Sequence, residues 1–308
     1  MKAVVIHEFG SVDVLRIEDL PTPEPKPDEV LVKVHAASIN PVDYKIRSGK
    51  YPPVPFEQLP VVLGRDVSGT VERCGSIAAK FKPDDAVYAL LDGRNGGYAE
   101  FVIVKERDLV AKPAQAGFNE AAAVPLAAIT AWQGLFDHGI LQSGQHVLIH
   151  GGAGGVGHFA IQCAKARGAR VSTTVSNQDL EFVRELGADQ AIDAAGRFED
   201  ELSDVDLVLD LIGGEIQERS WAVLKRGGTM VSTLSQPSAS QAKAHSVRAD
   251  HYVAQASAQE LGEIGALLDA GKLRPHIAAV FRFEDVAAAQ RQLESHHNRG
   301  KIILHVFE

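Results

Sequence analysis

The stretch HVLIHGGAGGVGHFAIQCAKARG, residues 146–168, decides the fold of this chain. Five of the seven residues 151–157 are glycine, and they lie between an apolar run and a segment with the residue pattern of a helix. Gly152, Gly154 and Gly157 fit the spacing G-x-G-x-x-G. Between a strand and a helix, this spacing permits a tight turn, lets backbone N–H groups approach a pyrophosphate, and lets helix and strand pack closely. The stretch therefore predicts a dinucleotide-binding unit, with a glycine-rich turn that holds no ligand as the alternative.

The composition argues against several classes of partner. The 308 residues carry a formal net charge of −9, which disfavours nucleic acid or an anionic membrane as a partner. No apolar run is long enough to span a membrane, and Met1 opens into the strand-like AVVI without the charged and apolar regions of a signal peptide. The two cysteines, Cys74 and Cys163, lie far apart, which favours a reducing compartment over a disulfide framework. We therefore expect a cytoplasmic protein.

The residue pattern changes near Ala116. Before it, short strand-like runs such as KAVVI and AVYAL alternate with Pro- and Gly-rich turns, as in an all-β or barrel-like domain. After it, apolar strands alternate with helical segments such as IQERSWAVLKRG, which begins at Ile216. This alternation indicates βαβ units and a parallel sheet with helices on both faces. A strand-like GKIILHVF closes the chain. We expect an α/β protein of two domains, one of residues 1–115 and 273–308 and one of residues 116–272.

Further ligand-binding residues are expected where strands of the parallel sheet end, because open α/β sheets bind ligands at their carboxyl edge. The strand-like DLVLDLI ends at Ile212 and is followed by Gly213, and TMVSTL ends at Leu234. Together with the glycine loop, this edge gives one set of predicted cofactor-binding residues. The set is Gly152, Gly154, Gly155, Val156, Gly157, Ile212, Gly213, Ser232, Thr233 and Leu234.

The end of the strand-like RVSTTV indicates which dinucleotide binds. NAD-specific sites usually place an acidic residue there to bind the ribose 2′-OH. Here the strand runs into Ser176 and Asn177, with Asp179 already in the next helix, so we expect no carboxylate that would repel a 2′-phosphate. We predict NADPH, bound in part by Ser176 and Asn177, with NADH as the alternative. No Arg or Lys occupies this turn, so Arg299 or Lys301 could supply a basic group; otherwise they form a solvated pair before the last strand.

Longer blocks of the sequence resemble a known family. Their order is similar to that of the zinc-free quinone oxidoreductase branch of the medium-chain dehydrogenases/reductases. The matching blocks are ASINPVDYKIRSGKYP, LGRDVSGTV, GGYAEFVIV, PLAAITAWQGL, EFVRELGAD, DLIGGE, LKRGGTMVS, LLDAGKLRP and RGKIILHV, besides the glycine loop. The resemblance spans nearly the whole chain. It implies a GroES-like β-barrel domain that the final segment rejoins, a Rossmann domain with a doubly wound parallel sheet, and a homo-oligomer, either a homodimer or a tetramer.

The resemblance also locates the positions at which zinc-dependent relatives hold their metal. Those relatives need a catalytic Cys, a His in a Gly-His-Glu context and a second Cys, since zinc favours thiolate and imidazole ligands. Here the first position reads Ser38 or Asn40, and the Gly-His-Glu place reads Gly64-Arg65-Asp66. Two cysteines in the whole chain cannot complete either the catalytic site or a four-cysteine structural site. We predict that the protein binds no metal.

The resemblance assigns roles near the nicotinamide to four residues. Asn40 and Asp43 in NPVDYKIR are a polar pair beside it, and Tyr51 in the GKYP turn matches the place of a proton-donating tyrosine in enoyl-reducing relatives. Thr130 in AITAW resembles the threonine that lies near the nicotinamide carboxamide. Structural alternatives are a turn residue before Pro41 for Asn40, a loop aromatic over the site for Tyr51, and an ordinary helical threonine for Thr130.

The expected chemistry follows from the predicted absence of a metal. Alcohol oxidation then loses its usual way of stabilising an alkoxide, whereas reduction of a quinone or conjugated carbonyl needs hydride and hydrogen-bond donors. We therefore expect an NADPH-dependent reductase that acts on a small-molecule quinone or α,β-unsaturated carbonyl. Two alternatives stay open: an enal or enone double-bond reductase with little quinone activity, and a nucleotide-binding structural or redox-sensing protein without turnover.

Overall fold

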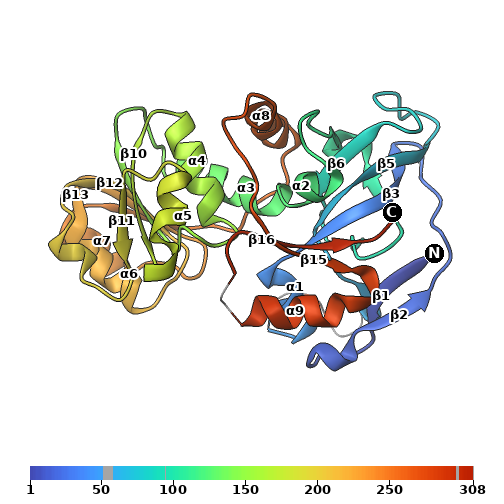
Figure 1. Ribbon diagram of the computed structural model, residues 1–308, viewed down its shortest axis with the longest axis horizontal. Helices are drawn as coiled ribbons and strands as arrows, with labels where there is room; N and C mark the ends of the chain where they lie inside the picture. The colour runs from blue at the N-terminus through green and yellow to red at the C-terminus, as the bar shows by residue number, and fades with distance from the viewer. Residues whose placement is uncertain (51–57, 94, 296–297, 308) are drawn as a thin grey trace. The chain divides into compact units, whose positions relative to one another are not determined.

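The computed structural model describes residues 1–50, 58–93, 95–295 and 298–307, and the chain divides into two compact units (Figure 1). Unit 1 comprises Met1–Leu126, Ala256–Ala270 and Pro275–Glu308. Unit 2 comprises Ala127–Gln255 and Gly271–Arg274. The chain therefore begins and ends in unit 1, with unit 2 inserted in its middle.

Unit 2 is built on a six-stranded sheet in which every pair of neighbours is parallel. Its strands are β9 (His146–His150), β10 (Arg170–Val175), β11 (Gln190–Asp193), β12 (Val205–Asp210), β13 (Leu224–Ser232) and β14 (Arg248–His251). They lie in the order β11-β10-β9-β12-β13-β14, so the winding reverses between β9 and β12. This is the strand order of a Rossmann fold, and the predicted doubly wound parallel sheet is confirmed.

Helices connect most successive strands of this sheet, and a 3₁₀ turn at Phe198–Asp200 lies between β11 and β12 (Figure 1). They are α4 (Gly157–Ala166), α5 (Leu180–Glu185), α6 (Glu215–Arg219) and α7 (Ala239–His245). Every residue of β9 is buried, as expected of a central parallel strand that is covered on both faces. Leu148 of β9 packs with Val208, Met230 and Trp221 in an apolar core of the unit.

Unit 1 contains a seven-stranded, mostly antiparallel sheet and a three-stranded sheet. The larger sheet has the order β15-β16-β3-β5-β6-β8, and β7 also pairs with β3. Its strands are β3 (Glu29–Ile39), β5 (Asp66–Cys74), β6 (Ala86–Leu90), β7 (Phe101–Lys105), β8 (Val110–Ala111), β15 (Ile277–Arg282) and β16 (Lys301–His305). The smaller sheet is formed by β1 (Lys2–Ile6), β2 (Arg16–Asp19) and β4 (Val61–Val62). Because β16 pairs antiparallel with β3, the C-terminal strand rejoins the N-terminal sheet, as expected.

Short helices cover the sheets of unit 1. They are α1 (Pro41–Arg47), α2 (Phe118–Ala122), α8 (Ala258–Asp269) and α9 (Val286–Glu294). Helix α9 buries Val286 and Ala289 in an apolar core with Ile39 and Tyr98. Among the described residues, no helix has both the length and the apolar character needed to cross a membrane.

The structure divides the chain differently from the expected boundaries, which placed residues 116–126 and 256–270 with the parallel sheet. Helix α2 packs against β3 and β5, and α8 packs against β8, so both belong to unit 1. The buried hydroxyl of Tyr88 on β6 donates to the carbonyl oxygen of Leu261 on α8 at 2.7 Å. These contacts join residues far apart in sequence, which helical periodicity does not encode.

Two predicted elements of unit 2 are shorter than expected. The strand-like DLVLDLI ends as a strand at Asp210, which leaves Ile212 in the following turn. The helix expected from Ile216 onward ends at Arg219, a 3₁₀ turn follows, and β13 begins at Leu224. Trp221 and Val223 are both buried in the core, and this spacing of two suits turn and extended backbone better than a helix.

Candidate functional site

The glycine loop forms the turn between β9 and α4. Gly151 has a φ of +79°, a conformation that glycine adopts without steric cost. A Cβ at Gly152 would lie 2.1 Å from Thr173 Oγ1, and a Cβ at Gly157 would lie 2.2 Å from the carbonyl oxygen of Gly151. Real side chains do not approach so closely. Bare backbone at 152 and 157 therefore lets the loop pack against β10 and lets α4 begin beside β9.

Gly154 differs from these two, because the fold does not require glycine there. Its φ lies outside the left-handed region, and the nearest atom to an added Cβ is the Gly151 carbonyl oxygen at 3.4 Å. No described side chain caps the N-terminus of α4, which begins at Gly157 after Gly155 and Val156. The first N–H groups of such a helix, together with its dipole, favour an anion. The loop therefore has the open space and the donors that a pyrophosphate requires.

Asp210, at the end of β12, organises the carboxyl edge beside this loop. It is fully buried, and its Oδ1 accepts hydrogen bonds from the backbone N–H groups of Ile212 at 3.0 Å and Gly213 at 2.8 Å. Its Oδ2 accepts from Gln217 Nε2 at 2.8 Å and from Ser232 Oγ at 3.0 Å. One carboxylate thus joins three of the predicted cofactor-binding residues. Sequence reasoning did not select Asp210, although an acidic residue at the end of an apolar strand was a signal for it.

His150, at the end of β9, is a second buried polar residue that the sequence reasoning did not select. Its Nδ1 lies 2.8 Å from Thr174 Oγ1 and its Nε2 lies 2.8 Å from Ser220 Oγ. Ser220 donates its own proton to the carbonyl oxygen of Ile216 at 2.6 Å, so the Nε2 of His150 must donate to Ser220. Burial lowers the pKa of His150 to about 4, against the opposing charge of Asp210. The ring is therefore a neutral link between β10 and the 3₁₀ turn after α6.

Two apolar side chains stand exposed at the same edge. Ile212 is 53% exposed and Leu234 is 45% exposed. A Cβ at Gly151 would lie 2.9 Å from Ile212 Cδ1, and a Cβ at Gly213 would lie 3.2 Å from Leu234 Cδ1. Both side chains therefore lie against the glycine-containing turns, and they offer apolar surface to the flat face of a ring. Thr233 follows β13, and its N–H donates to the carbonyl oxygen of Asp210 at 3.3 Å.

The turn after β10 contains a carboxylate, contrary to the expectation from sequence. Ser176 Oγ donates to Asp179 Oδ2 at 2.5 Å, and the N–H of Asp179 donates to the Ser176 carbonyl oxygen. The 3₁₀ turn Asn177–Asp179 brings the acid back toward the strand end, which a count of residues along the chain did not reveal. Asn177 is exposed. The single proton of the Ser176 hydroxyl thus already has an acceptor.

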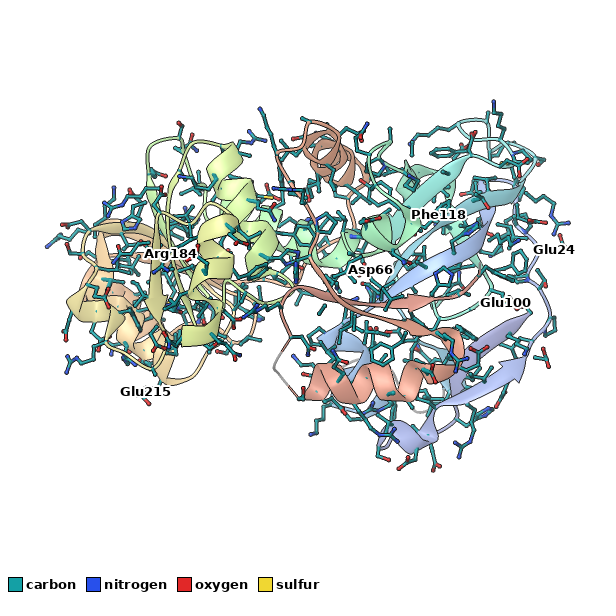
Figure 2. The ribbon with its side chains drawn as sticks, in the orientation of Figure 1. Glu24, Asp66, Glu100, Phe118, Arg184 and Glu215 are labelled. Atoms are coloured by element: carbon teal, nitrogen blue, oxygen red, sulfur yellow. The ribbon has the colours of Figure 1, made fainter. Side chains whose placement is uncertain are left out.

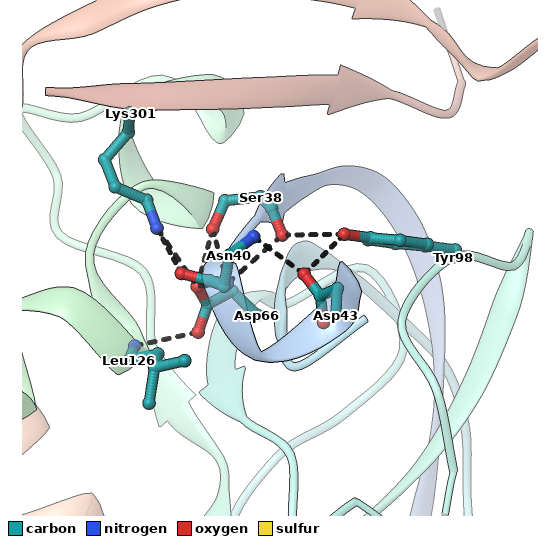
Figure 3. Close-up of polar contacts among 7 residues, drawn as sticks. All are labelled: Ser38, Asn40, Asp43, Asp66, Tyr98, Leu126 and Lys301. Carbon is teal, nitrogen blue, oxygen red and sulfur yellow. Dashed lines mark hydrogen bonds and ion pairs between the residues drawn. The ribbon is translucent and has the colours of Figure 1, made fainter. Parts of the chain in front are cut away.

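A buried polar cluster in unit 1 holds Asn40 (Figure 3). The side-chain amide of Asn40 donates to Asp66 Oδ2 at 2.8 Å, and its amide oxygen accepts a hydrogen bond from Lys301 Nζ. Ser38 Oγ donates to the same Asp66 oxygen at 2.5 Å, while Asp66 Oδ1 accepts from the N–H of Leu126 at 2.8 Å. Asp66 is fully buried, unlike surface acids of the unit such as Glu24 (Figure 2).

Asp43 adjoins this cluster at the first turn of α1. Its Oδ2 accepts from the N–H of Asn40 at 2.7 Å and from the hydroxyl of Tyr98 at 2.6 Å (Figure 3). Its Oδ1 has no hydrogen-bond partner among the described residues. Complete burial raises the pKa of Asp43 to about 6, although the bonds from Tyr98 and Asn40 act in the opposite direction. Tyr98 and Asp66 are members of this site that sequence reasoning did not include.

The structure gives Lys301 a different partner from the expected 2′-phosphate. Its side chain is 3% exposed. Its ammonium donates a hydrogen bond to the amide oxygen of Asn40 and lies 3.8 Å from Asp66 Oδ2. Burial lowers the pKa of Lys301, while Asp66 and Asp43 oppose that shift. Lys301 is therefore a core residue of β16 and not part of a solvated pair, and its contact with the 2′-phosphate stays a prediction. Arg299 is exposed, and its charge helps burial to lower the pKa of His276.

Two further predicted residues complete the set. Thr130 lies in the last turn of α3 (Pro125–Trp132), nearly buried, and its carbonyl oxygen accepts a hydrogen bond from the hydroxyl of Tyr252. Tyr51 lies outside the described residues. The structure therefore brings the predicted residues together in two groups, one at the carboxyl edge of the unit 2 sheet and one around Asn40 in unit 1.

The donor atoms around Asn40 do not suit zinc. The cluster offers a carboxylate, an amide and a hydroxyl, together with the ammonium of Lys301, and it holds neither a thiolate nor an imidazole. Zinc in proteins prefers those two ligands. Within the described ranges, no group of three or more His, Cys, Asp or Glu side chains could hold a metal ion. A cation entering this cluster would have to displace the ammonium of Lys301.

Comparison with known proteins identifies the family. Residues 26–114 match the family described as alcohol dehydrogenase GroES-like domain, which confirms the predicted GroES-like fold of unit 1. Residues 186–304 match the family described as zinc-binding dehydrogenase. The structure of the quinone oxidoreductase from Coxiella burnetii is 36% identical and superimposes with a TM-score of 0.92, covering 100% of this chain and 99% of that one.

Two curated relatives match the chain over nearly its whole length. The mitochondrial NAD(P)H oxidoreductase RTN4IP1 of Danio rerio is 36% identical over 357 residues, which cover 100% of this chain and 92% of that protein. The chloroplastic NADPH-dependent alkenal/one oxidoreductase of Arabidopsis thaliana is 37% identical over 318 residues, covering 99% and 79%. These similarities confirm the resemblance read from the sequence: the chain belongs to the quinone oxidoreductase branch of the medium-chain dehydrogenase/reductase superfamily.

Proposed function

We propose that the protein is an NADPH-dependent, zinc-independent reductase that transfers hydride to a quinone or an α,β-unsaturated carbonyl. The observation that carries the proposal is the open space in front of Gly154, at the turn where the winding of a Rossmann sheet reverses. The names of the relatives support it, since one reduces with NAD(P)H and another is named for alkenals and enones.

In this proposal, unit 2 binds and orients the dinucleotide, which supplies hydride when bound. Gly155 and Val156 offer backbone N–H groups to the pyrophosphate at the start of α4. The N–H of Gly154 donates to the carbonyl oxygen of Gly151 at 3.1 Å, so the role of Gly154 is to leave the ligand room to approach. Ile212 and Leu234 provide apolar surface, and Asp210 holds the turn at Ile212 and the end of β13 in place through its bonds to Gly213 and Ser232. The role of Thr130 is to contact the nicotinamide carboxamide.

The preference for NADPH over NADH depends on the turn after β10. Ser176 and Asn177 are the proposed contacts of the 2′-phosphate. Because Ser176 already donates to Asp179, NADPH binding requires the serine proton to turn from the carboxylate to the phosphate. That competition limits how strongly the turn can select a 2′-phosphate over a 2′-OH, so NADH has to be measured beside NADPH. Arg299 stays a candidate for the basic contact.

In unit 1, we propose that Asn40 and Asp43 shape the acceptor site by holding β3 and α1 in place. The amide of Asn40 has partners on both its atoms, and Asp43 bonds both Tyr98 and the backbone of Asn40. The direct hydrogen-bond or proton donor to the acceptor oxygen is then Tyr51. Donors aimed at a developing enolate or quinol oxygen stabilise it where no metal does.

The first experiment compares NADPH and NADH oxidation against a quinone, an enal and an enone. We expect turnover of the quinone with NADPH, unchanged after treatment with a chelator. Preference for the enal and enone would favour the second candidate, a double-bond reductase, which the Arabidopsis thaliana relative's name supports. Tight NADPH binding without turnover of any acceptor would favour a nucleotide-binding sensor and overturn the proposal.

Location and assembly are parts of the same proposal. The family resemblance predicts a homodimer or tetramer, which light scattering of the purified protein would measure. The two cysteines are both free in the structure, in keeping with the reducing, cytoplasmic location that we propose. One relative is named mitochondrial and another chloroplastic, so imaging of the tagged chain in cells is the test of location.

A further inference from the structure

The helix that carries Thr130 changes its hydrogen-bond pattern immediately after that residue. Helix α3 ends at Trp132, and residues Gln133–His138 continue as a π-helical segment. The N–H of Gly139 donates to the carbonyl oxygen of Gly134, a spacing of five residues instead of four. Single π-helical turns of this kind occur mostly where a side chain or a function requires the wider helix.

The side chain of Tyr252 accounts for this change. Its hydroxyl donates to the carbonyl oxygen of Thr130 and accepts a hydrogen bond from the N–H of Gly134. In a regular α-helix, those two backbone groups would bond to each other. A Cβ at Gly134 would lie 2.5 Å from the Tyr252 hydroxyl oxygen, so the hydroxyl can enter the helix because residue 134 is glycine.

The segment around Tyr252 is attached to the helix at several other points. Gln133 donates through Nε2 to the carbonyl oxygen of Gln255 at 2.9 Å, and the N–H of Gln255 donates back to Gln133 Oε1 at 3.0 Å. His138 Nδ1 lies 2.7 Å from Asp250 Oδ2. The ring of His138 also stacks on Tyr252 with 4.4 Å between centroids. Residues 250–255 therefore contact the π-helical segment at both of its ends, Gln133 and His138.

Tyr252 also reaches the carboxyl edge of the sheet. Its backbone N–H donates to the carbonyl oxygen of Ser232 at 3.3 Å, and Ser232 Oγ donates to Asp210. One residue therefore bonds the main chain at both Thr130 and Ser232. These two positions belong to the proposed dinucleotide site, while Tyr252 itself is nearly buried.

We propose that Tyr252 is a positioning residue for the dinucleotide, which fixes Thr130 relative to the end of β13 by inserting its hydroxyl into the helix. The proposal rests on the function proposed above, in which Thr130 contacts the nicotinamide. The π-helical segment closes each hydrogen bond over five residues instead of four, and this wider turn sets the direction of the Thr130 side chain relative to the turns that follow. Without the inserted hydroxyl, the helix closes toward the regular α-helical pattern and Thr130 rotates with it.

The test measures the dissociation constant of NADPH by fluorescence titration, together with KM and kcat, in Tyr252→Phe. We expect the dissociation constant and KM for NADPH to rise about five- to tenfold, as for one lost hydrogen bond, with a smaller change in kcat. Gly134→Ala should have the same effect, because its methyl group displaces the hydroxyl that Tyr252 inserts. If one of the two variants folds poorly, the NADPH dissociation constant of the other variant still tests the proposal.

Matched controls separate positioning from stability. Tyr88→Phe removes another buried hydroxyl that donates to a backbone carbonyl oxygen, in unit 1. Gly262→Ala adds a methyl group to helix α8, where nothing lies within 4 Å. Both should leave NADPH binding unchanged, although Tyr88→Phe should lower the melting temperature. If Tyr252→Phe lowers the melting temperature as Tyr88→Phe does but binds NADPH as tightly as the parent protein, the hydroxyl is only structural and the proposal is wrong.

A double-mutant cycle with Thr130→Ala distinguishes the failure of this inference from the failure of the proposed function. We expect Thr130→Ala to weaken NADPH binding and Tyr252→Phe to add little in its background. If the two effects are additive, Tyr252 does not act through Thr130, and the inference fails while the cofactor site stands. If Thr130→Ala has no effect, the role of Thr130 in the proposed function fails, and the inference fails with it.

Discussion

The ammonium of Lys301 donates a hydrogen bond to the amide oxygen of Asn40 and lies 3.8 Å from a carboxylate oxygen of Asp66, inside unit 1. All three side chains are buried, so the ammonium balances a carboxylate that water cannot reach. These contacts of Lys301 join β16 to Asn40, which directly follows β3, and to Asp66 on β5. The C-terminal strand thus supplies a charge on which the proposed acceptor-site residue Asn40 depends.

Removal of this charge should destabilise the protein strongly. A buried carboxylate left without its partner typically costs about 3–5 kcal/mol, so we expect Lys301→Met to lower the free energy of unfolding by about that amount. Lys2→Met, on the exposed side of β1, is the matched control and should change little. Urea unfolding measures both. The double variant Lys301→Met with Asp66→Asn should recover part of the loss, and equal stability of Lys301→Met and the parent would contradict the assignment.

Asp43 should make the stability of the protein fall as the pH rises. Burial raises its pKa from 3.8 to about 6, so the folded chain holds a proton in this range that the unfolded chain releases. The contribution of the protonated group is present at low pH and is lost through about pH 6. We expect the parent to lose roughly 2–3 kcal/mol relative to Asp43→Asn between pH 4 and pH 7. Urea unfolding of both proteins at the two pH values checks this, and a constant difference would refute it.

His150 should act in the opposite direction. Burial lowers its pKa to about 4, whereas the unfolded chain protonates near the ordinary value of 6.5. Its contribution to stability is therefore complete above pH 6.5 and is lost as the pH falls toward 4. Nitrogen NMR of the imidazoles at pH 5.5 should show the His150 ring neutral with its proton on Nε2, the atom that donates to Ser220. A His150 ring protonated at that pH would contradict the burial argument, and a proton on Nδ1 would contradict the tautomer.

The sequence predicted those elements that depend on a local residue pattern. It did not predict features that depend on contacts between side chains far apart in the chain. The glycine spacing predicted the β9–α4 turn, and alternation of strands and helices predicted the Rossmann sheet, because both are encoded within short windows. The burial of Lys301 was not predictable in this way, since its partners lie far away in sequence, Asn40 at the start of α1 and Asp66 on β5. The approach of Asp179 to Ser176 depends on the geometry of one 3₁₀ turn, which residue types alone do not specify.

Gly154 gives the most direct test of the dinucleotide loop. Its added Cβ would meet nothing closer than 3.4 Å, so Gly154→Ala should leave the melting temperature almost unchanged. If a pyrophosphate approaches the backbone there, the same methyl group should hold it away from the N–H groups of Gly155 and Val156. NADPH binding should then weaken about tenfold or more, as expected for loss of one charge-assisted hydrogen bond. Gly262→Ala adds the same methyl group to open space on a helix of unit 1 and serves as the control. Calorimetric titration with NADPH measures both variants. Equal affinity in the two would place the pyrophosphate away from residue 154, whereas a loss confined to Gly154→Ala would identify the open space as the ligand's own.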